Sequence, residues 1–595
     1  MFYRALTDEQ TLRVRRARPV IALAAVAFAI GVIVGANSGA SSADSLAGRF
    51  VAAWARSDYT AMYADIDPAS RRSLNADEFA SAYRDAMRTA TATSLRATGK
   101  PRSAPGGLVS VPMVVHTRLF GTLALSVGLR VVSGAEGGDA VAWSRSLTFP
   151  GVQPGETLSR RTSLPPRAKL LARDGSVLAE GEASQAGTRS SPLGELAGAV
   201  VGEVGPIPSS RRIALEMQGV PSDADVGTSG LERALDARLR GTPGGELLAA
   251  SAQSGRSGRV LANVPARPAH AVRTSISPTV QRAAVAALGS RLGGVVALAP
   301  TGQILAVAGI GLDSVQPPGS TFKMVTLTGV LDAHVASPRT EFPYATYATL
   351  DGVKLSNANG EECGGSLTLA FAVSCNSVFA PLGVKLGASR LVAMAERFGF
   401  NHAPGVEGAA ESTLPAASDI QGELDVGSTA IGQGRVQASA LQMAIVAASI
   451  ADGGRRPRPT FTPERLAPGP RVTSVKVART VRRLMIGVVR NGTGTSAAIP
   501  EVTVAGKTGT AELKTECTSS SQAQSGESGS HEADASGCVG ADSEASNTDA
   551  WFASFAPALA PRVVVGVLLV KEGAGGDTAA PVAREVLEAG LRATR

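Results

Sequence analysis

The sequence of 595 residues predicts a multidomain α+β protein, with a membrane helix, an α+β domain, an elongated linking region and a C-terminal α/β domain. Three observations support this fold class. The length corresponds to roughly three to four domains. Hydrophobic residues make up 44% of the chain, which is enough to fill sizeable cores. Apolar positions recur first with helical and then with strand-like periodicity, before an α/β pattern takes over.

The membrane helix is predicted over residues 19–36, a run without any charged residue. As a helix this run is about 27 Å long, which is just enough to cross a bilayer. Arg13, Arg15, Arg16 and Arg18 directly precede it, so residues 1–18 are expected in the cytoplasm and the rest of the chain outside. The expected location is therefore the plasma membrane, with a single pass and an extracytoplasmic body. The alternative is a cleaved signal peptide, with the small residues 37–43 as its cleavage site.

Two regions follow the membrane helix. Residues 44–150 are predicted to form an α+β domain, because 44–99 has helical periodicity and 108–149 alternates like strands. Residues 153–270 are rich in glycine and proline, and long irregular arms are expected there. Within them, 170–178 reads as a short hairpin with an Asp-Gly turn.

Residues 271–595 are predicted to form the C-terminal α/β domain. We expect a helix over 279–292, strands over 294–298 and 304–308, and a closing strand over 563–570. The segment 513–548 is rich in Ser, Gly, Glu and Asp, which indicates a disordered polar insertion. A lid beside a cleft and an inert loop both remain open for it.

The net charge of +8 raises the question of a nucleic-acid partner. The arginines are scattered along the sequence and only 4% of the residues are aromatic, so nothing resembles a base-stacking platform. We therefore predict no nucleic-acid partner; the surplus charge suits an anionic envelope or has no function. The five histidines lack metal-ligand spacing, so we expect no metal and no other cofactor.

The four cysteines occur as two local pairs, Cys363 with Cys375 and Cys517 with Cys538. Neither pair has the short spacing of a zinc site. In an oxidising compartment each pair could close a small disulfide loop, and the alternative is four free thiols. A bridge between Cys363 and Cys375 would fix the loop that carries Ser374.

The segment Ser320-Thr321-Phe322-Lys323 is the first candidate for chemistry. A serine hydroxyl needs a neighbouring base to act as a nucleophile. Lysine can be that base if burial or a nearby cation lowers its pKa, whereas arginine cannot lose its proton. The chain has nine lysines and 49 arginines, and only Lys323 has a serine three positions before it. An apolar run follows the Pro-Pro-Gly before Ser320, so we expect Ser320 at a helix N-terminus with Lys323 in reach.

Two later segments turn this weak signal into a strong one. Ser374-Cys375-Asn376 lies inside the apolar stretch 367–382, and Lys507-Thr508-Gly509 follows the strand-like run 502–506. Ser-x-x-Lys, Ser-x-Asn and Lys-Thr-Gly in this order are the motifs of penicillin-binding proteins and serine β-lactamases. The chain resembles the monofunctional (class B) penicillin-binding proteins, which are D,D-transpeptidases, over about its last 300 residues.

The resemblance extends beyond the three motifs and implies a domain order. Segments 317–323, 431–434, 506–512 and 549–553 are similar to those of the class B transpeptidase domain. Residues 44–150 resemble the NTF2-like N-terminal domain of MecA-type transpeptidases, and 230–241 is similar to the linker or dimerisation domain of class B proteins. The resemblance thus implies an NTF2-like domain, a dimerisation-type domain at 153–270, and a serine β-lactamase-like transpeptidase domain at 271–595.

The resemblance also implies a role for each motif residue. Ser320 would be the acylated nucleophile and Lys323 its base, while Ser374 relays a proton to the leaving amine and Asn376 binds the substrate peptide group. Lys507 would supply positive potential beside the substrate carboxylate, with Thr508, Gly509 and Thr510 as further binding residues. The backbone N–H groups of Ser320 and Thr510 would form the oxyanion hole.

The implied reaction is cross-linking of peptidoglycan stem peptides that end in D-Ala-D-Ala, through a serine acyl-enzyme that β-lactams also form. No glycosyltransferase module is visible in the sequence, so a membrane polymerase of the RodA/FtsW type is the implied partner, in cell-shape or cell-division synthesis. A D,D-carboxypeptidase, a low-affinity β-lactam-resistant variant and a β-lactamase-like hydrolase remain alternatives. Cys375, at the middle position of Ser-x-Asn, argues against a class A β-lactamase, which carries Asp there.

Overall fold

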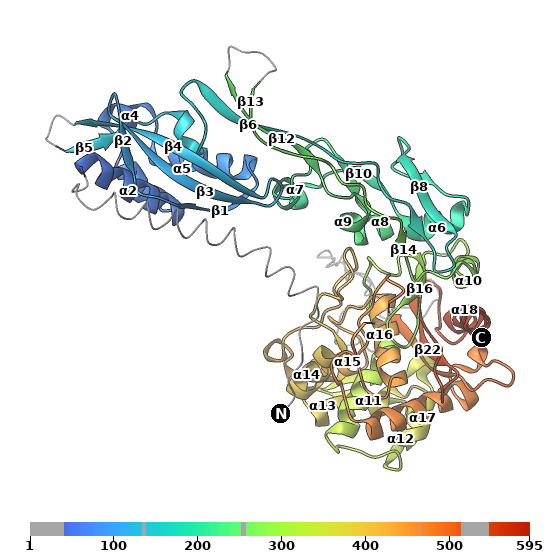
Figure 1. Cartoon of the computed structure of the whole chain (residues 1–595). Coiled ribbons are helices and arrows are strands. Elements are labelled where there is room, and N and C mark those ends of the chain that lie inside the picture. The colour runs from blue at the N-terminus through green and yellow to red at the C-terminus, as the bar shows by residue number, and fades with distance from the viewer. Residues whose placement is uncertain (1–40, 134–137, 252–257, 465, 513–546, 595) are drawn as a thin grey trace, which may run out of the picture. The chain divides into compact units, whose positions relative to one another are not determined.

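The computed structural model describes residues 41–133, 138–251, 258–464, 466–512 and 547–594 (Figure 1). The predicted membrane helix, the pair Cys517 and Cys538, and nearly all of the polar insertion lie outside the described residues. In the described ranges no single helix has the length and apolar composition needed to cross a bilayer. The helices α13 (Asn376–Leu386) and α14 (Ala388–Phe398), which meet at a 100° bend, pass this test only as a pair. The chain divides into two compact units, which are described separately.

The first unit comprises the described residues of 1–163, 211–221 and 243–266. Helices come first and strands follow, as the sequence predicts. The helices are α2 (Ser42–Ala55), α3 (Tyr59–Ala64), α4 (Pro68–Ser73) and α5 (Ala76–Thr89). The strands are β1 (Ala92–Ala97), β2 (Arg102–Ala104), β3 (Leu108–Thr117), β4 (Thr122–Ser133) and β5 (Asp139–Val141), and they form one sheet in the order β1-β3-β4-β5 with β2 beside β3.

Side-chain patterning explains why this unit folds locally as it does. Asn75 begins α5 with a capping box, in which Asn75 and Glu78 each accept a hydrogen bond from the other's backbone N–H. Phe79 and Tyr83, one turn apart on α5, are fully buried against Trp54 of α2 and the sheet. The unit also contains a second sheet with the strand order β13-β12-β6. Its strands are β6 (Glu156–Ser163), β12 (Gly244–Ser251) and β13 (Arg259–Val264). The remaining helices of the unit are η1 (Arg145–Thr148) and α7 (Ser209–Glu216).

The second unit begins with short, irregular elements. The predicted hairpin is present as β7 (Leu170–Leu171) and β8 (Val177–Ala183), and Gly175 takes the positive φ of +92° that its turn requires. The other elements are β9 (Arg189–Ser190), α6 (Glu195–Val201), β10 (Val204–Pro206), β11 (Asp225–Gly227), α8 (Gly230–Ala234), α9 (Asp236–Leu239) and β14 (Val272–Arg273).

A buried ion cluster holds these short elements together. Glu232 of α8 is fully buried and accepts hydrogen bonds from Arg167 Nε (2.6 Å) and Arg189 Nη1 (2.8 Å). Asp236 of α9 accepts from Arg167 Nη1 (2.9 Å) and from Arg240 Nη1 (2.6 Å). Because a region of short strands and helices has little apolar surface of its own, this cluster fixes how its elements pack.

An antiparallel five-stranded sheet forms the centre of the C-terminal domain. Its strand order is β16-β15-β23-β22-β21, and every neighbouring pair is antiparallel. Alternate residues of the central strands enter two separate apolar cores, one with α10 and α18 and the other with α11, α13 and α16. The bounds are β15 (Gly293–Leu298), β16 (Ile304–Gly309), β21 (Ala505–Glu512), β22 (Thr548–Ala556), β23 (Val563–Leu569), α10 (Pro278–Leu288), α11 (Lys323–Asp332), α13 (Asn376–Leu386), α16 (Ala440–Ala451) and α18 (Ala579–Ala593).

Two sequence predictions need correction in this domain. The strand-like run predicted over residues 502–506 begins later than expected, because β21 starts at Ala505 and contains the Lys-Thr-Gly motif. The predicted helix 279–292 ends at Leu288, where Gly289 takes a positive φ of +61°. The remaining elements are η2 (Gly319–Phe322), β17 (Glu341–Ala345), β18 (Tyr347–Leu350), β19 (Val353–Ser356), η3 (Ala358–Gly360), β20 (Cys363–Ser366), α12 (Leu367–Ala372), α14 (Ala388–Phe398), η4 (Ala417–Asp419), α15 (Gly422–Ala430), α17 (Val475–Asn491) and η5 (Thr495–Ala497).

Helix α17 gathers basic side chains on its solvent face. Lys476, Arg479, Arg483 and Arg490 are exposed and lie at positions that share one side of a helix. The helix contains no acidic residue. The prediction that basic residues are merely scattered is therefore wrong for this helix, because positions that are separated in the sequence align along its axis.

Replacing Glu232 with glutamine should lower the free energy of unfolding of the second unit by about 3–5 kcal/mol. The physical reason is that Arg167 and Arg189 would keep buried charges after losing the carboxylate between them. The measurement is denaturant-induced unfolding of the purified protein and the Glu232→Gln variant. As a matched control, Glu588→Gln removes one partner of the half-exposed pair with Arg584 and should cost less than about 1 kcal/mol. Equal destabilisation by the two variants would contradict the role given to the buried cluster.

Candidate active site

Ser320 lies in the short 3₁₀ helix η2, which runs directly into α11. Because a 3₁₀ helix has three residues per turn, positions 320 and 323 face the same way. Ser320 is half-buried, whereas Lys323, the first residue of α11, is fully buried. The serine is therefore accessible while its lysine neighbour is shielded from water.

Glycines let this turn approach its neighbours closely. Gly319 has a φ of +50°, and a Cβ at this position would lie 2.6 Å from the carbonyl oxygen of Thr510. The Gly319 N–H donates to the carbonyl of Gly432 (3.0 Å), inside the segment 431–434 that the sequence singled out. The serine turn is thus held between that segment and strand β21.

Ser374 occupies the turn between α12 and α13, and Asn376 is the first residue of α13. The backbone of Ser374 is left-handed, with a φ of +63°, which is uncommon for a residue with a Cβ. The next residue, Cys375, forms a disulfide with Cys363 of β20 (S–S 2.09 Å). This covalent link holds the turn in the conformation that presents Ser374.

Lys323 donates hydrogen bonds to the Ser-x-Asn turn. Its Nζ lies 2.6 Å from the carbonyl oxygen of Ser374, 2.6 Å from Asn376 Oδ1 and 3.5 Å from Ser374 Oγ. Among the described residues none of its hydrogen bonds goes to Ser320, although the sequence predicts direct reach. A neutral lysine amine has two N–H groups and one lone pair. In the neutral form of the amine the two short bonds would use both N–H groups and leave the lone pair available to accept a proton.

Lys507 reaches the same serine from strand β21. Its Nζ donates to Ser374 Oγ (2.8 Å) and to the carbonyl oxygen of Thr508 (3.0 Å). Ser374 therefore lies between the two lysines and contacts both. The three motifs, which are far apart in the sequence, meet at this one side chain.

Burial sets the charge of both lysines. Burial lowers the pKa of Lys507 to about 7. Burial, and after it the positive charge of Lys507, lowers the pKa of Lys323 well below its usual range. Each ammonium position lies 5.6 Å from an aromatic ring centre, Lys323 over Phe379 and Lys507 over Phe371. In the part of the chain that the structure describes, no carboxylate pairs with either lysine and no cluster of His, Cys, Asp or Glu could hold a metal ion.

Thr508 and Thr510 are each oriented by a neighbour that the sequence did not reveal. The hydroxyls of Thr508 and Thr493 are hydrogen-bonded to each other at 2.5 Å. Thr510 Oγ1 accepts from the backbone N–H of Gly575 (3.3 Å). Between these threonines, Gly509 has no room for a side chain, since a Cβ would lie 2.7 Å from the Pro318 carbonyl oxygen.

Asn357 is a further residue that sequence reasoning missed. It is buried, and its Nδ2 donates to the carbonyl oxygens of Ala345 and Glu361, both at 2.8 Å. Its Oδ1 accepts from the backbone N–H of Ser377 (2.8 Å), one residue beyond Asn376. Asn357 thereby ties the start of α13 to the hairpins β17–β20, and no motif in the sequence signals this contact.

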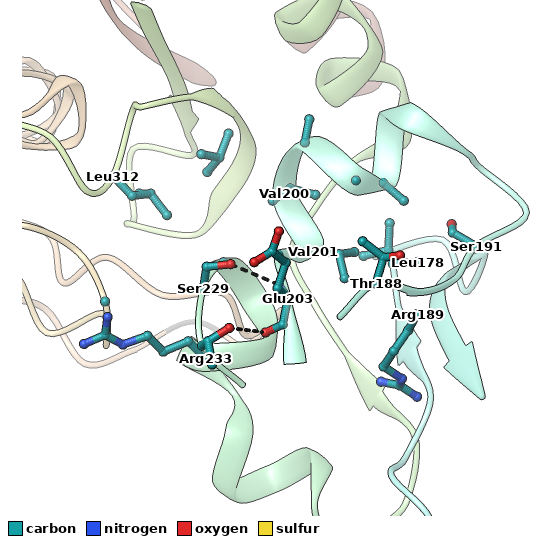
Figure 2. Close-up of a pocket in the computed structure, with 18 of the residues that line it drawn as sticks. Leu178, Thr188, Arg189, Ser191, Val200, Val201, Glu203, Ser229, Arg233 and Leu312 are labelled. Atoms are coloured by element: carbon teal, nitrogen blue, oxygen red, sulfur yellow. Dashed lines mark hydrogen bonds between the residues drawn. The ribbon is translucent and has the colours of Figure 1, made fainter. Parts of the chain in front are cut away.

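The predicted site residues do not line a cavity that lies elsewhere in this unit. A cavity of about 600 Å³ lies between α6, the start of α8 and the loop after β16 (Figure 2). Its wall is stabilised by Glu203, whose N–H donates to Ser229 Oγ (3.0 Å) and whose carbonyl oxygen accepts from Thr228 Oγ1 (3.1 Å). None of the motif residues from Ser320 to Thr510 lines it.

Three domain families match the chain in the order that the sequence predicts. The NTF2-like N-terminal transpeptidase domain matches residues 42–156, the penicillin-binding protein dimerisation domain 182–274, and the penicillin binding protein transpeptidase domain 293–588.

Named relatives and a solved structure support the same assignment. Peptidoglycan D,D-transpeptidase PbpA of Mycolicibacterium smegmatis is 33% identical over 394 residues, which cover 54% of this chain and 72% of the relative. PbpA of Mycobacterium tuberculosis is 34% identical over 307 residues, 46% of this chain, and this chain spans only 55% of that relative's length. The ceftriaxone acyl-enzyme complex of penicillin-binding protein A from M. tuberculosis is 27% identical, with a TM-score of 0.53, and the match covers 71% of this chain and 98% of that one.

The geometry and these similarities agree. The chain therefore belongs to the class B penicillin-binding proteins, with an NTF2-like domain, a dimerisation domain and a transpeptidase domain.

Proposed function

We propose that this protein is a D,D-transpeptidase that cross-links peptidoglycan stem peptides through an acyl-enzyme on Ser320. The observation that carries the proposal is the bonding of Ser374 Oγ and its turn to two buried lysines, next to a half-buried serine. This arrangement supplies a base, a proton relay and positive potential in one place. The names of the relatives, which are D,D-transpeptidases, support the same reaction.

In the acylation step, Ser320 Oγ would attack the carbonyl carbon of the penultimate D-Ala. Lys323 would accept the serine proton, because burial lowers the pKa of its amine and so favours the neutral form, which has a lone pair. As the C–N bond breaks, a proton would pass through Ser374 to the departing amine of the terminal D-Ala. Asn376 would bind the substrate peptide group through its amide, whose Nδ2 now donates to the Ser356 carbonyl (2.9 Å).

Strand β21 is suited to hold the substrate and the developing oxyanion. The Thr510 carbonyl points toward Gly319, and the N–H and C=O of one strand residue point to the same side. The Thr510 N–H would therefore face the serine turn and form the oxyanion hole with the Ser320 N–H. Cationic Lys507, with Thr508, Gly509 and Thr510, would bind the substrate carboxylate.

The second half-reaction, which removes the acyl group from Ser320, distinguishes a transpeptidase from a hydrolase. An amine from a neighbouring stem peptide would attack the acyl carbon, form the cross-link and release Ser320 Oγ with its proton. Water in place of the amine would give a D,D-carboxypeptidase, or a β-lactamase if the acyl group comes from a β-lactam. Low β-lactam affinity is a further alternative, favoured by the NTF2-like domain that the chain shares with MecA-type proteins.

We also propose a membrane location for the enzyme and a glycosyltransferase as its partner. The uncharged run 19–36 would anchor it in the plasma membrane, with the catalytic domain on the outer side. Glycan polymerisation would come from a RodA/FtsW-type glycosyltransferase, because none of the matched domain families supplies that activity.

Incubating the fragment from about residue 40 onward with benzylpenicillin should give a single covalent adduct on Ser320. The measurement is the intact mass of the protein, recorded over time by mass spectrometry. A persistent adduct is expected because an opened β-lactam ring remains tethered and blocks access of the acceptor amine. Ser320→Ala should show no adduct. Rapid loss of the adduct would contradict the transpeptidase in favour of a hydrolase, and an adduct in Ser320→Ala would contradict the assignment of the nucleophile.

The second-order rate of acylation by benzylpenicillin should fall as the pH rises above about 7, by about tenfold per unit. The sign follows from the pKa of Lys507, which burial lowers to about 7: the side chain is cationic below this pH and neutral above it. Loss of its charge removes the attraction for the β-lactam carboxylate. The measurement is the acylation rate at pH 6 to 9 under conditions that report the free enzyme.

Lys507→Arg is the matched variant for this pH dependence. Arginine stays protonated throughout the range, so the variant should react more slowly than the wild type at pH 6 but lose the alkaline decline. An unchanged decline in Lys507→Arg would show that another group titrates.

A further inference from the structure

The segment 571–576, which follows β23, lies across the part of the sheet that carries Thr510. Backbone N–H groups of alternate residues tie it down: Lys571 to Asp549 Oδ1 (3.0 Å), Gly573 to the Thr548 carbonyl (3.2 Å), and Gly575 to Thr510 Oγ1 (3.3 Å). A Cβ on Gly575 would lie 2.3 Å from the carbonyl oxygens of both Gly509 and Trp551. The segment therefore packs so closely against the sheet that position 575 has no room for a side chain.

Asp549 accepts the hydrogen bond from the Lys571 N–H although burying its carboxyl group costs free energy. It is fully buried in β22, and its Oδ2 has no hydrogen-bond partner among the described residues. Burial raises the pKa of its carboxyl group, while the Lys571 N–H and the Lys571 charge act in the opposite direction. A valine or alanine would avoid the buried, half-satisfied carboxyl group, so packing alone does not explain an acid here.

Backbone geometry explains what the carboxyl group does. The ladder between β22 and β23 ends at the pair Ala550 and Leu569. Lys571 then takes a left-handed φ of +58°, so its N–H cannot continue the regular pairing. Asp549 Oδ1 serves as the acceptor in place of a strand carbonyl. The side chain thus sets the direction in which the segment leaves the strand.

The C-terminal end of the segment, at Gly575, sets the orientation of the Thr510 hydroxyl. Because Thr510 Oγ1 accepts from the Gly575 N–H, its own O–H remains free to donate. A donor directed into the site suits the carboxylate of a stem peptide or β-lactam. If the segment shifted, this hydroxyl would lose its orientation, and the N–H of the same residue belongs to the expected oxyanion hole.

We propose that Asp549 is a positioning residue for acylation, which acts through the segment 571–576 on Thr510. This inference rests on the function proposed above. Asp549 contacts no substrate in this account; its effect reaches the reaction through the Lys571 N–H, the chain to Gly575 and the Thr510 hydroxyl.

The test compares second-order rates of benzylpenicillin acylation and thermal midpoints for a set of single and double variants. Asp549→Ala should lower the rate about tenfold, the size of one hydrogen bond lost from the transition state. Asp549→Asn keeps an acceptor for the Lys571 N–H and should recover most of that loss. Ser554→Ala is the matched control, because Ser554 Oγ on the same strand is also buried without a partner among the described residues. It should leave the rate unchanged.

The decisive measurement is the Asp549→Ala change in a Thr510→Val background. Without the Thr510 hydroxyl the segment has nothing to orient, so the added loss should be less than about twofold. A tenfold loss in both backgrounds would mean a general structural role and would overturn the proposal. So would Asp549→Ala with a normal rate, or a folded Asp549→Asn as slow as Asp549→Ala. Absence in the wild type of both acylation by benzylpenicillin and cross-linking of a stem peptide would instead overturn the proposed function.

Discussion

The structure of the candidate site depends on two lysine amines kept out of water beside one serine. Lys323 and Lys507 are both fully buried, and both contact Ser374. Two ammonium ions so close together would repel each other, and burial penalises each of them separately. The pKa of Lys323 is therefore lowered well below its usual range, and the pKa of Lys507 is lowered to about 7. A base and a positive charge thus coexist in one site because their environments differ.

The rest of the domain holds the side chains of Lys323, Lys507 and Ser374 in fixed positions relative to one another. Lys323 comes from a helix start, Ser374 from a left-handed turn and Lys507 from a sheet edge, so each belongs to a different kind of element. Rigid links join these elements: the disulfide from Cys363 to Cys375, and close backbone contacts at Gly319 that no larger residue would permit. Such links cost conformational freedom, but they remove the reorganisation that a mobile site would need at each turnover.

Sequence reasoning found the chemistry more readily than the contacts. The order of Ser320, Ser374 and Lys507 in their motifs carried a resemblance to class B penicillin-binding proteins, and that resemblance implied the domain order and the residues that meet. It did not predict that Lys323 bonds to the Ser-x-Asn turn. Asn357, Gly575 and Asp549 were missed because their roles arise from tertiary contacts with residues far away in the chain. Local periodicity carries no information about such contacts.

The distribution of arginine and lysine follows from the same physics. In the buried cluster of the linking region the cations are arginines, and each is paired with Glu232 or Asp236. There a permanent charge is an advantage, because it neutralises a buried carboxylate. In the candidate active site the basic side chains are lysines without a carboxylate partner in the described residues. A paired acid would stabilise the protonated amine and raise its pKa, which would remove the base. The absence of an acidic partner is therefore as necessary to Lys323 as its burial, and an arginine at either lysine position would leave a charge that could not be given up.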